Sequence, residues 1–283
     1  MASDLRTRAI LAPTMLLLIG GVYWLDYAAV LGLKQGALSA GLLALLGIGG
    51  MFEFIALLRM GGFEVSRVLL PIVTAGLLVS AFPLGWHQID HEFYPLIAGT
   101  LALFFPLALH SLSRSDMQRG LERQGATLLG FVYIAWPVYL AIGTCFRSLP
   151  SVLFVVLVCK GGDIGGYCLG RLFGRTKLIP HISPGKTVEG ALGSLATSML
   201  LAVVLRAPLL TPAVPLSAVA AVAVGAVLNF TTQTGDLIES LLKRRCGAKD
   251  SSHLLPAHGG ILDLVDSLLF SFCAWFPVLV WLT

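Results

Sequence analysis

Residues 257–283 read AHGGILDLVDSLLFSFCAWFPVLVWLT, and this stretch indicates the kind of fold that the chain adopts. A membrane helix needs about 20 consecutive apolar residues to cross the hydrocarbon core, and residues 261–282 supply a run of that length. Asp263 and Asp266 nevertheless lie at the head of the run, directly behind a glycine pair. Since a carboxylate in lipid is costly, the stretch predicts a functional site at the start of a membrane helix.

The composition of the whole chain is that of a polytopic membrane protein. Of its 283 residues, 57% are hydrophobic and 12% are charged, and the mean hydropathy is +0.87. A soluble domain is about 25% charged. Backbone groups in lipid must bond within their own segment, so the chain is predicted to be an all-α polytopic integral membrane protein with about nine transmembrane helices. The candidate spans are residues 9–27, 37–58, 67–86, 94–111, 126–146, 149–168, 190–205, 212–233 and 261–282.

The first apolar run, residues 9–27, follows two arginines, as the core of a signal peptide does. The run is long and lacks a clear small-residue cleavage site, so it is predicted to be a retained first span. No linker or soluble segment interrupts the chain. We therefore expect a single integral membrane domain over residues 1–283, with the N-terminal helices in 1–150 and the site-bearing segments in 151–283.

The distribution of positive charge predicts the orientation. If the N-terminus is cytoplasmic, only Lys34, Arg147 and Arg206 fall in outer loops. Cytoplasmic loops are enriched in Lys and Arg, so this orientation is the expected one. It places the two long polar segments, 160–190 and 234–266, on the cytoplasmic face of the cell membrane.

The first polar segment reads CKGGDIGGYCLGRLFGRTKLIPHISPGKTVEG, residues 159–190. Asp163 lies near the end of a span and is predicted to face a polar cavity, a cation or another helix; a solvated helix end is the alternative. The glycines on either side of Asp163 permit close approach, either of two helices or of a ligand.

The tripeptide Gly185-Lys186-Thr187 is similar to the end of a P-loop. That motif requires glycine at position 180, where this chain has proline, so a P-loop is rejected. Ser183 is predicted instead to cap a helix that has Pro184 as its first residue, which would place Lys186 and Thr187 at a phosphate-binding helix start. The alternative is a plain helix start with Lys186 reaching the interface.

The second polar segment reads TGDLIESLLKRRCGAKDSSHLLPAHGGILDLVDS, residues 234–267. Asp236, Glu239 and Lys243 share one face of a helix by their spacing. A basic cluster follows, for which simple anchoring at the membrane surface is the alternative. The cluster consists of Lys243, Arg244, Arg245 and Lys249, with Asp250 next to it.

Carboxylates that converge at one membrane surface repel one another unless a cation lies among them. Asp236, Asp263 and Asp266 are therefore predicted to bind Mg²⁺, which prefers hard oxygen ligands and shares its coordination shell with phosphates; a second cation is left open. His258 is predicted to act as an acid or base, as a phosphate donor or as a structural loop residue. The glycines that follow it would let a substrate approach the helix start.

The second segment resembles the defining motif of the phosphatidate cytidylyltransferases, also called CDP-diacylglycerol synthases. The residues in register are Gly235, Asp236, Ser240, Lys243, Arg244, Lys249, Asp250, His258, Gly259, Gly260, Asp263 and Asp266. The first segment resembles another block of this family through Asp163, Tyr167, Gly170, Gly174, Lys177, Ser183, Pro184, Lys186, Thr187, Glu189 and Gly190. The two blocks cover the C-terminal half of the chain, whereas the N-terminal spans match only in general character.

The resemblance implies that CTP and phosphatidic acid react to give CDP-diacylglycerol and pyrophosphate in phospholipid biosynthesis. It implies catalytic roles for Lys243, Arg244, Lys249, Asp250 and His258, substrate binding by Asp163, Ser183, Lys186, Thr187, Glu189, Gly259 and Gly260, and metal binding by Asp236, Asp263 and Asp266. The expected partners are the two substrates and membrane lipid. A homodimer is one expected assembly, and no nucleic acid partner is expected.

The chain departs from the family motif at three positions. Gly185 and Val188 are mild departures, but Leu264 stands where the family has arginine. Loss of that arginine removes a fixed charge and five hydrogen-bond donors, which predicts lower activity unless Lys243 or Arg245 compensates. Two alternatives follow: a related enzyme acting on another lipid, such as a polyprenyl or isoprenoid kinase or cytidylyltransferase, or a weakly active homologue or transporter.

Overall fold

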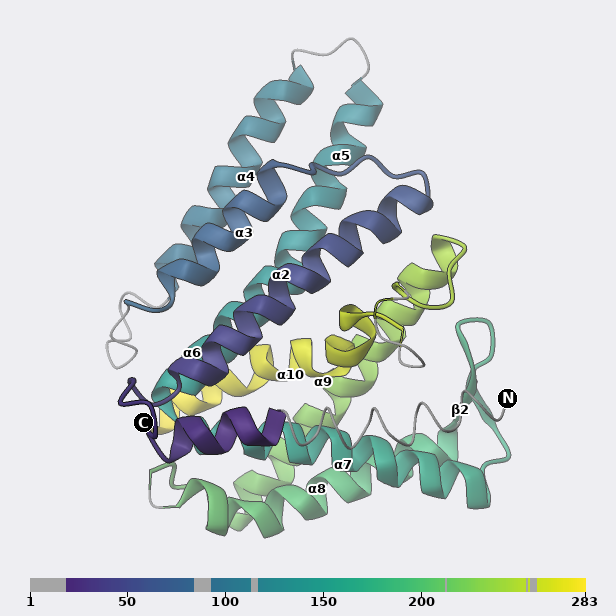
Figure 1. Cartoon of the computed structure of the whole chain (residues 1–283). Coiled ribbons are helices and arrows are strands. Elements are labelled where there is room, and N and C mark those ends of the chain that lie inside the picture. The colour runs from purple at the N-terminus through teal and green to yellow at the C-terminus, as the bar shows by residue number, and fades with distance from the viewer. Residues whose placement is uncertain (1–18, 84–92, 113–116, 212, 253, 255–258) are drawn as a thin grey trace. The chain divides into compact units, whose positions relative to one another are not determined.

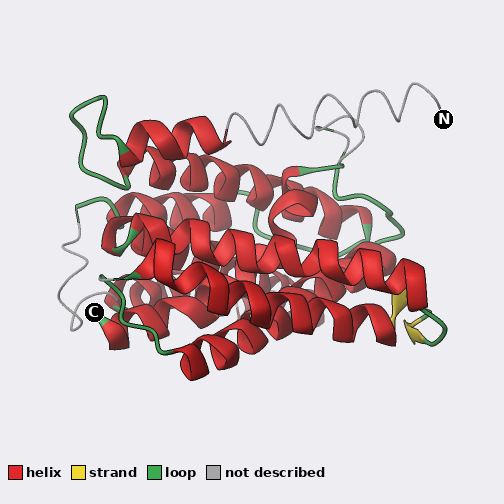
Figure 2. Ribbon diagram, turned by 90° about the horizontal axis from the view of Figure 1, so that it is seen from below, coloured by secondary structure: helices red, strands yellow, loops and turns green. Residues whose placement is uncertain are grey.

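The structure is a computed structural model of the 283-residue chain, and helices form most of the part that it describes (Figure 2). The described residues are 19–83, 93–112, 117–211, 213–252, 254 and 259–283. The chain divides into two compact units. Unit 1 consists of Met1–Arg147 and Arg245–Leu264, and unit 2 consists of Ser148–Arg244 and Val265–Thr283.

The N-terminal helices lie in unit 1. They are a helix over residues 19–27, α2 (Ala37–Met60), α3 (Leu69–Ser80), α4 (Tyr94–Leu112) and α5 (Met117–Gly130), which continues through a π-helical turn, η2 (Phe131–Ala135), into α6 (Trp136–Arg147). The start of α2 is held by Asp26, whose side chain is 3% exposed. Its two carboxylate oxygens accept hydrogen bonds from the backbone N–H groups of Gly36 (2.9 Å) and Ser39 (2.8 Å).

Unit 2 combines long helices with a short hairpin. Its elements are α7 (Leu149–Phe173), β1 (Lys177–Ile179), β2 (Ser183–Thr187), α8 (Val188–Leu210), α9 (Ala218–Arg245) and α10 (Ile261–Leu282), with the last residue of α9 and the first four residues of α10 assigned to unit 1. The strands pair antiparallel, with Lys177 opposite Thr187 and Ile179 opposite Ser183. The hairpin projects beyond the adjacent ends of α7 and α8 (Figure 1).

Seven helices of the described chain are long and apolar enough to cross a membrane. They correspond to the predicted spans 37–58, 94–111, 126–146, 149–168, 190–205, 212–233 and 261–282. The prediction of a mostly helical chain with several candidate membrane-spanning helices is therefore confirmed, and the hairpin of β1 and β2 is its one departure from an all-α fold among the described residues. The predicted span 67–86 coincides with α3, which is apolar but only 12 residues long. The predicted span 9–27 overlaps residues outside the described part, so the count of nine stays a prediction.

Helices α7 and α8 lie side by side (Figure 1). Small residues line the sides that face each other. A Cβ atom added to Gly166 would lie 2.9 Å from Cβ of Ser194 and 3.0 Å from the carbonyl oxygen of Gly190. One added to Gly170 would lie 3.2 Å from Cα of Gly190. Small residues four positions apart permit this close approach, so helix packing is confirmed as one role of these glycines.

The prediction that Ser183 caps a helix beginning at Pro184 is wrong. Both residues lie in β2, and α8 begins four residues later, at Val188. Thr187 is the actual N-cap, and its hydroxyl accepts a hydrogen bond from the N–H of Gly190 at 3.1 Å. Ser183 and Thr187 both have hydroxyl groups that can cap a helix. Pairing with β1 holds Ser183–Thr187 extended, so the helix begins only after Thr187.

We expect Gly225→Ala to destabilise unit 2. A Cβ atom at this position in α9 would lie 2.7 Å from Cα of Met199 and 2.8 Å from the carbonyl oxygen of Ser198 in α8. Since backbone atoms cannot rotate away, the helices must separate, and overpacking of this kind costs about 1–3 kcal/mol. Thermal denaturation in detergent should show a melting temperature lower by several degrees.

Gly76→Ala in α3 is the matched control for this measurement, because the added Cβ meets no atom within 4 Å apart from the neighbouring backbone of its own helix. It should leave the melting temperature unchanged or raise it slightly, since alanine favours helices over glycine. Equal melting temperatures for the two variants would contradict the close packing of α8 and α9.

Candidate active site

Unit 2 contains a cavity of about 440 Å³ at the end that carries the hairpin. Its walls come from α7, the hairpin, the first turns of α8, and α9. The cavity brings together residues that the sequence predicted separately, and these are Asp163, Ser183, Lys186, Thr187 and Asp236. Tyr167 and Arg171 of α7 line it as well. A lysine, an arginine and hydroxyl groups in one cavity provide the donors that a phosphate needs.

An ion pair joins the two polar segments of the sequence. The ammonium group of Lys186, from β2, contacts the carboxylate of Asp236, from α9, and both side chains are half-buried. Both residues were predicted to belong to the site, but nothing in the sequence indicated that they pair. The contact shows that the first segment folds against α9, within unit 2.

Glu189 has a different place from the one that the motif suggested. It lies in the first turn of α8 and is not among the residues that line the cavity. Both of its carboxylate oxygens accept the backbone N–H of Thr176, at 3.1 and 3.2 Å. In this structure Glu189 therefore holds the chain just before β1, and its predicted role in substrate binding stays a prediction.

Three carboxylates of unit 2 converge next to this ion pair. Each of them offers one carboxylate oxygen, and the three oxygens lie within 4.8 Å of one another. The residues are Asp236 and Glu239 of α9 and Asp266 of α10. Glu239 is fully buried and Asp266 is 7% exposed. The predicted shared face of α9 is confirmed, since Lys243 pairs with Glu239 at 2.5 Å. Glu239 was absent from the predicted metal ligands, although its spacing of three residues from Asp236 was a signal for it.

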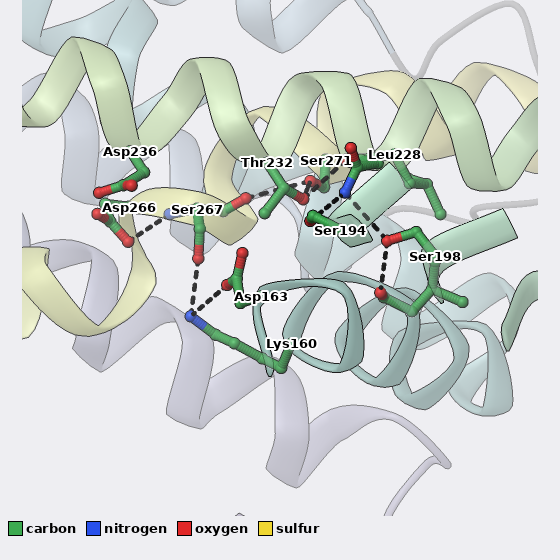
Figure 3. A network of polar contacts seen from close by, with 12 residues as sticks. Lys160, Asp163, Ser194, Ser198, Leu228, Thr232, Asp236, Asp266, Ser267 and Ser271 are labelled. Carbon is green, nitrogen blue, oxygen red and sulfur yellow. Dashed lines mark hydrogen bonds and ion pairs between the residues drawn. The ribbon is translucent and has the colours of Figure 1, made fainter. Parts of the chain in front are cut away.

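A lysine inside α7 reaches the segment that carries Asp266 (Figure 3). The ammonium group of Lys160 donates to the hydroxyl of Ser267 at 2.7 Å and lies 4.0 Å from the carboxylate of Asp163. The backbone N–H of Ser267 in turn donates to the carboxylate of Asp266, at 2.5 Å. Lys160 therefore links α7 to α10 beside the carboxylate cluster. Lys160 is not among the site residues that the sequence predicted.

Buried hydroxyl and amide groups continue the polar contacts along the helices of unit 2 (Figure 3). The side-chain amide of Asn229 donates to the hydroxyl of Ser194 at 2.6 Å and to that of Ser198 at 3.2 Å. The hydroxyl groups of Thr232 and Ser271 lie 2.9 Å apart. Such contacts join membrane helices through hydrogen bonds rather than by burial alone, and they hold α8, α9 and α10 in fixed register.

Asp263, the remaining predicted metal ligand, lies in unit 1 at the first turn of α10. One of its oxygens, Oδ2, accepts hydrogen bonds from the N–H of Ser251 (2.8 Å), the hydroxyl of Ser251 (2.7 Å) and the N–H of Gly260 (2.8 Å). Gly259 has a φ of +87°, and a Cβ there would lie 2.5 Å from the same oxygen. Asp263 thus organises the chain before α10, and its metal role stays a prediction.

The other motif residues are distributed between the two units. Arg244 is exposed near the end of α9, and Lys249 and Asp250 are exposed in the segment that follows it. The structure therefore does not by itself assign them contacts with a substrate. His258 lies outside the described residues.

Comparison with known protein families matches residues 7–282 to the cytidylyltransferase family. The chain belongs to this family. It is 33% identical to the phosphatidate cytidylyltransferase of Staphylococcus haemolyticus over an alignment of 267 residues. The alignment covers 93% of this chain and 92% of that protein. It is 37% identical over 153 residues to the Bacillus subtilis phosphatidate cytidylyltransferase, covering 50% and 55%. It is also 37% identical over 145 residues to the uncharacterized protein YnbB of Escherichia coli, covering 51% and 47%.

These matches confirm the resemblance that the two polar segments indicated. The chain spans about half the length of the Bacillus and Escherichia relatives in these alignments and nearly all of the Staphylococcus relative. The residues that unit 2 brings together are therefore a candidate active site of a cytidylyltransferase-family protein.

We expect Asp266→Asn to weaken divalent cation binding by this cytidylyltransferase-family protein. The substitution removes one of three clustered carboxylate charges, and even loss of a residue that only supports a metal ligand typically costs about 10–100-fold in affinity. Binding of Mn²⁺, followed by its electron paramagnetic resonance in the absence of nucleotide, measures the effect directly.

Glu122→Gln serves as the control for charge alone. Glu122 is an exposed carboxylate of α5 that contacts Gln118 and belongs to no carboxylate cluster of the described chain. Its variant should bind Mn²⁺ as the unaltered protein does. Equal affinities for all three proteins would contradict a cation site at Asp236, Glu239 and Asp266.

Proposed function

We propose that this chain is a CTP:phosphatidate cytidylyltransferase of the cytoplasmic membrane, which makes CDP-diacylglycerol and pyrophosphate. The observation that carries the proposal is the group of carboxylates Asp236, Glu239 and Asp266 beside a cavity that holds Lys186. Membership of the cytidylyltransferase family supports the reaction class. Relatives named phosphatidate cytidylyltransferase, one of them aligned over 93% of the chain, support the lipid substrate.

The carboxylate cluster fits a divalent cation such as Mg²⁺. Three hard oxygen ligands within 4.8 Å of one another suit this ion, which binds few protein carboxylates and completes its coordination shell with water and phosphate. When bound, Mg²⁺ neutralises the charge that builds up on the phosphates of the nucleotide. Asp236, Glu239 and Asp266 would hold it. A ligand role for Asp263 and the presence of a second cation belong to the same proposal.

The reaction needs charge neutralisation and alignment more than covalent help from the protein. A phosphate oxygen of phosphatidic acid attacks the α-phosphorus of CTP and forms the new P–O bond. The bond from that phosphorus to the β-phosphate oxygen breaks, and pyrophosphate leaves with the electron pair. Because the attacking phosphate is already anionic at neutral pH, no strong general base is required.

Lys186 and Lys243 of unit 2 suit this task because each is paired with a carboxylate. The pair of Lys186 with Asp236 keeps both groups within the site before substrate arrives. An incoming triphosphate offers Lys186 a stronger anionic partner, and the carboxylate of Asp236 then becomes available to a cation. Lys243, Arg244, Lys249, Asp250 and His258 keep the roles that the motif implies.

The distribution of positive charge supports the proposed topology. The N-terminus is cytoplasmic, about nine helices cross the membrane, and the active site opens on the cytoplasmic side, where CTP is present. The acyl chains of phosphatidic acid enter sideways between helices from the inner leaflet. A homodimer is one arrangement consistent with this proposal.

Membranes containing the protein should form CDP-diacylglycerol from phosphatidic acid only when CTP and Mg²⁺ are both present. Asp263→Asn should lower turnover by at least the roughly 10–100-fold that loss of a metal-site residue costs, because it removes a motif carboxylate. Radiolabelled CTP with thin-layer chromatography of the lipid product measures the rate, with Glu122→Gln as the control.

Two outcomes would contradict this proposal. If the folded, unaltered protein has no turnover, cytidylyltransferase activity is excluded. If it turns over a polyprenyl alcohol in place of phosphatidic acid, the alternative lipid substrate is favoured. Unchanged turnover in Asp263→Asn would be compatible with the proposed activity but would refute a metal role for Asp263.

Leu264→Arg should raise turnover. The substitution restores the cation and the five donors that the family motif has at this position, next to Asp263 in sequence. The ratio kcat/KM for CTP is the quantity to compare, with Leu264→Met as the control that changes shape without adding charge. Equal values for the two variants would contradict the idea that Leu264 limits this chain.

A further inference from the structure

Unit 1 contains a buried carboxylate that no part of the motif includes. Glu53 lies within α2, and its side chain is only 8% exposed. One oxygen, Oε1, accepts the hydroxyl of Ser252 at 2.7 Å and the N–H of Ile261 at 2.9 Å. The other, Oε2, accepts the hydroxyl of Ser251 at 3.1 Å and the N–H of Leu262 at 2.8 Å. A single carboxylate therefore holds four donors of a segment about 200 residues away in the sequence.

The physical reason for this arrangement is that two unfavourable features offset each other. A carboxylate within a membrane helix costs about 2.5–3.5 kcal/mol when nothing satisfies it. The first N–H groups of any helix have no partner within the helix, and they form the positive end of its dipole. Glu53 supplies a negative charge and two acceptors to the first two residues of α10, Ile261 and Leu262.

Ser251 connects Glu53 with Asp263. Its hydroxyl lies 2.7 Å from Oδ2 of Asp263 and 3.1 Å from Oε2 of Glu53. A hydroxyl has one proton and donates to one acceptor at a time, so the two carboxylates share this donor. Gly260 leaves room for the arrangement, because a Cβ at that position would overlap both the hydroxyl of Ser251 and the carboxylate of Glu53.

We propose that Glu53 is a positioning residue for the described parts of the motif around it, residues 251–252 and 259–263. It fixes the first turn of α10 through two backbone N–H groups, and it fixes Asp263 through the shared hydroxyl of Ser251. The consequence for metal and nucleotide use rests on the proposed function. The consequence for the order of the segment does not, because it follows from the hydrogen bonds alone.

Glu53→Gln is the variant that tests the inference. In either orientation, the carboxamide NH₂ group takes the place of an oxygen that accepts a backbone N–H, from Ile261 or from Leu262. Those two backbone donors cannot turn to become acceptors, so one of them loses its partner. The side chain keeps its size, so the variant changes hydrogen bonding and charge with little change in packing.

Asp26→Asn is the matched control. Asp26 is also buried in unit 1 and also accepts two backbone N–H groups at the start of a helix, those of Gly36 and Ser39 at α2. The two variants therefore lose the same kind of interaction. They differ in which segment loses it, and Glu53 also accepts two serine hydroxyls. A general loss of stability affects both variants.

Hydrogen exchange read by mass spectrometry on the purified full chain, without substrates, is the first measurement. Glu53→Gln should exchange at least about tenfold faster in peptides covering residues 259–264, since hydrogen bonds to charged groups are worth that factor or more. Asp26→Asn should accelerate exchange in peptides covering residues 36–40 instead. Unchanged exchange at residues 259–264 in Glu53→Gln would overturn the inference.

Enzyme kinetics provide the second measurement. Glu53→Gln should raise the apparent KM for Mg²⁺ about tenfold or more, by the loss expected when a residue that supports a metal ligand is removed. Asp26→Asn should lower the melting temperature without changing that KM. An equal rise in both variants would overturn the inference, because Glu53 would then stabilise the chain without positioning the segment.

Ser251→Ala keeps the test decisive if Glu53→Gln does not fold. It removes the shared hydroxyl and leaves the contacts of Glu53 with α10 in place, so it should raise the KM for Mg²⁺ severalfold without faster exchange at residues 261–264. An unchanged KM in a chain whose Asp263→Asn variant does lose turnover would overturn the link to Asp263. If the unaltered chain has no turnover, the proposed function fails, while exchange still decides the role of Glu53.

Discussion

A carboxylate placed in a membrane helix is stable only where a cation or a set of hydrogen-bond donors meets it. The sites in both units satisfy this constraint. In unit 2, Lys186 meets Asp236 and Lys243 meets Glu239. In unit 1, serine hydroxyls and backbone N–H groups meet Glu53 and Asp263. The pairing of these carboxylates with cations and hydrogen-bond donors therefore positions the helices that carry them, as apolar packing does.

The two kinds of partner have different consequences for chemistry. A lysine ammonium stands on a flexible stem and can move to another anion, so a carboxylate paired with lysine can be released when a phosphate arrives. A backbone N–H cannot move without its helix, so a carboxylate held by N–H groups is fixed. Asp236 and Glu239 therefore suit an exchange of partners during turnover, whereas Glu53 suits the maintenance of one geometry. Under the proposed function, this distinction separates groups that would take part in the reaction from groups that position the chain.

Membrane helices were predictable because lipid imposes length and hydropathy on each segment by itself. The predicted span 261–282 coincides with α10, and the shared face of Asp236, Glu239 and Lys243 follows from helical spacing alone. The strand at Ser183–Thr187 was not predictable, because its helix-capping residues are local signals that pairing with β1 overrides. Glu53 could not be found either, because its partner Leu262 lies 209 residues further along the chain.

The glycine pair ahead of α10 shows how distant contacts determine a short motif. Gly259 has a φ of +87°, in the left-handed region that other residues rarely adopt. Gly260 has a different requirement, since any side chain there would overlap Ser251 and the carboxylate of Glu53. A larger residue at 260 would separate Glu53 from the first turn of α10 and leave both a carboxylate and helical N–H groups without partners. Glycine is therefore required at position 260 by Glu53, a carboxylate of another helix. In this structure, the group that approaches Gly260 closely is a side chain of the protein.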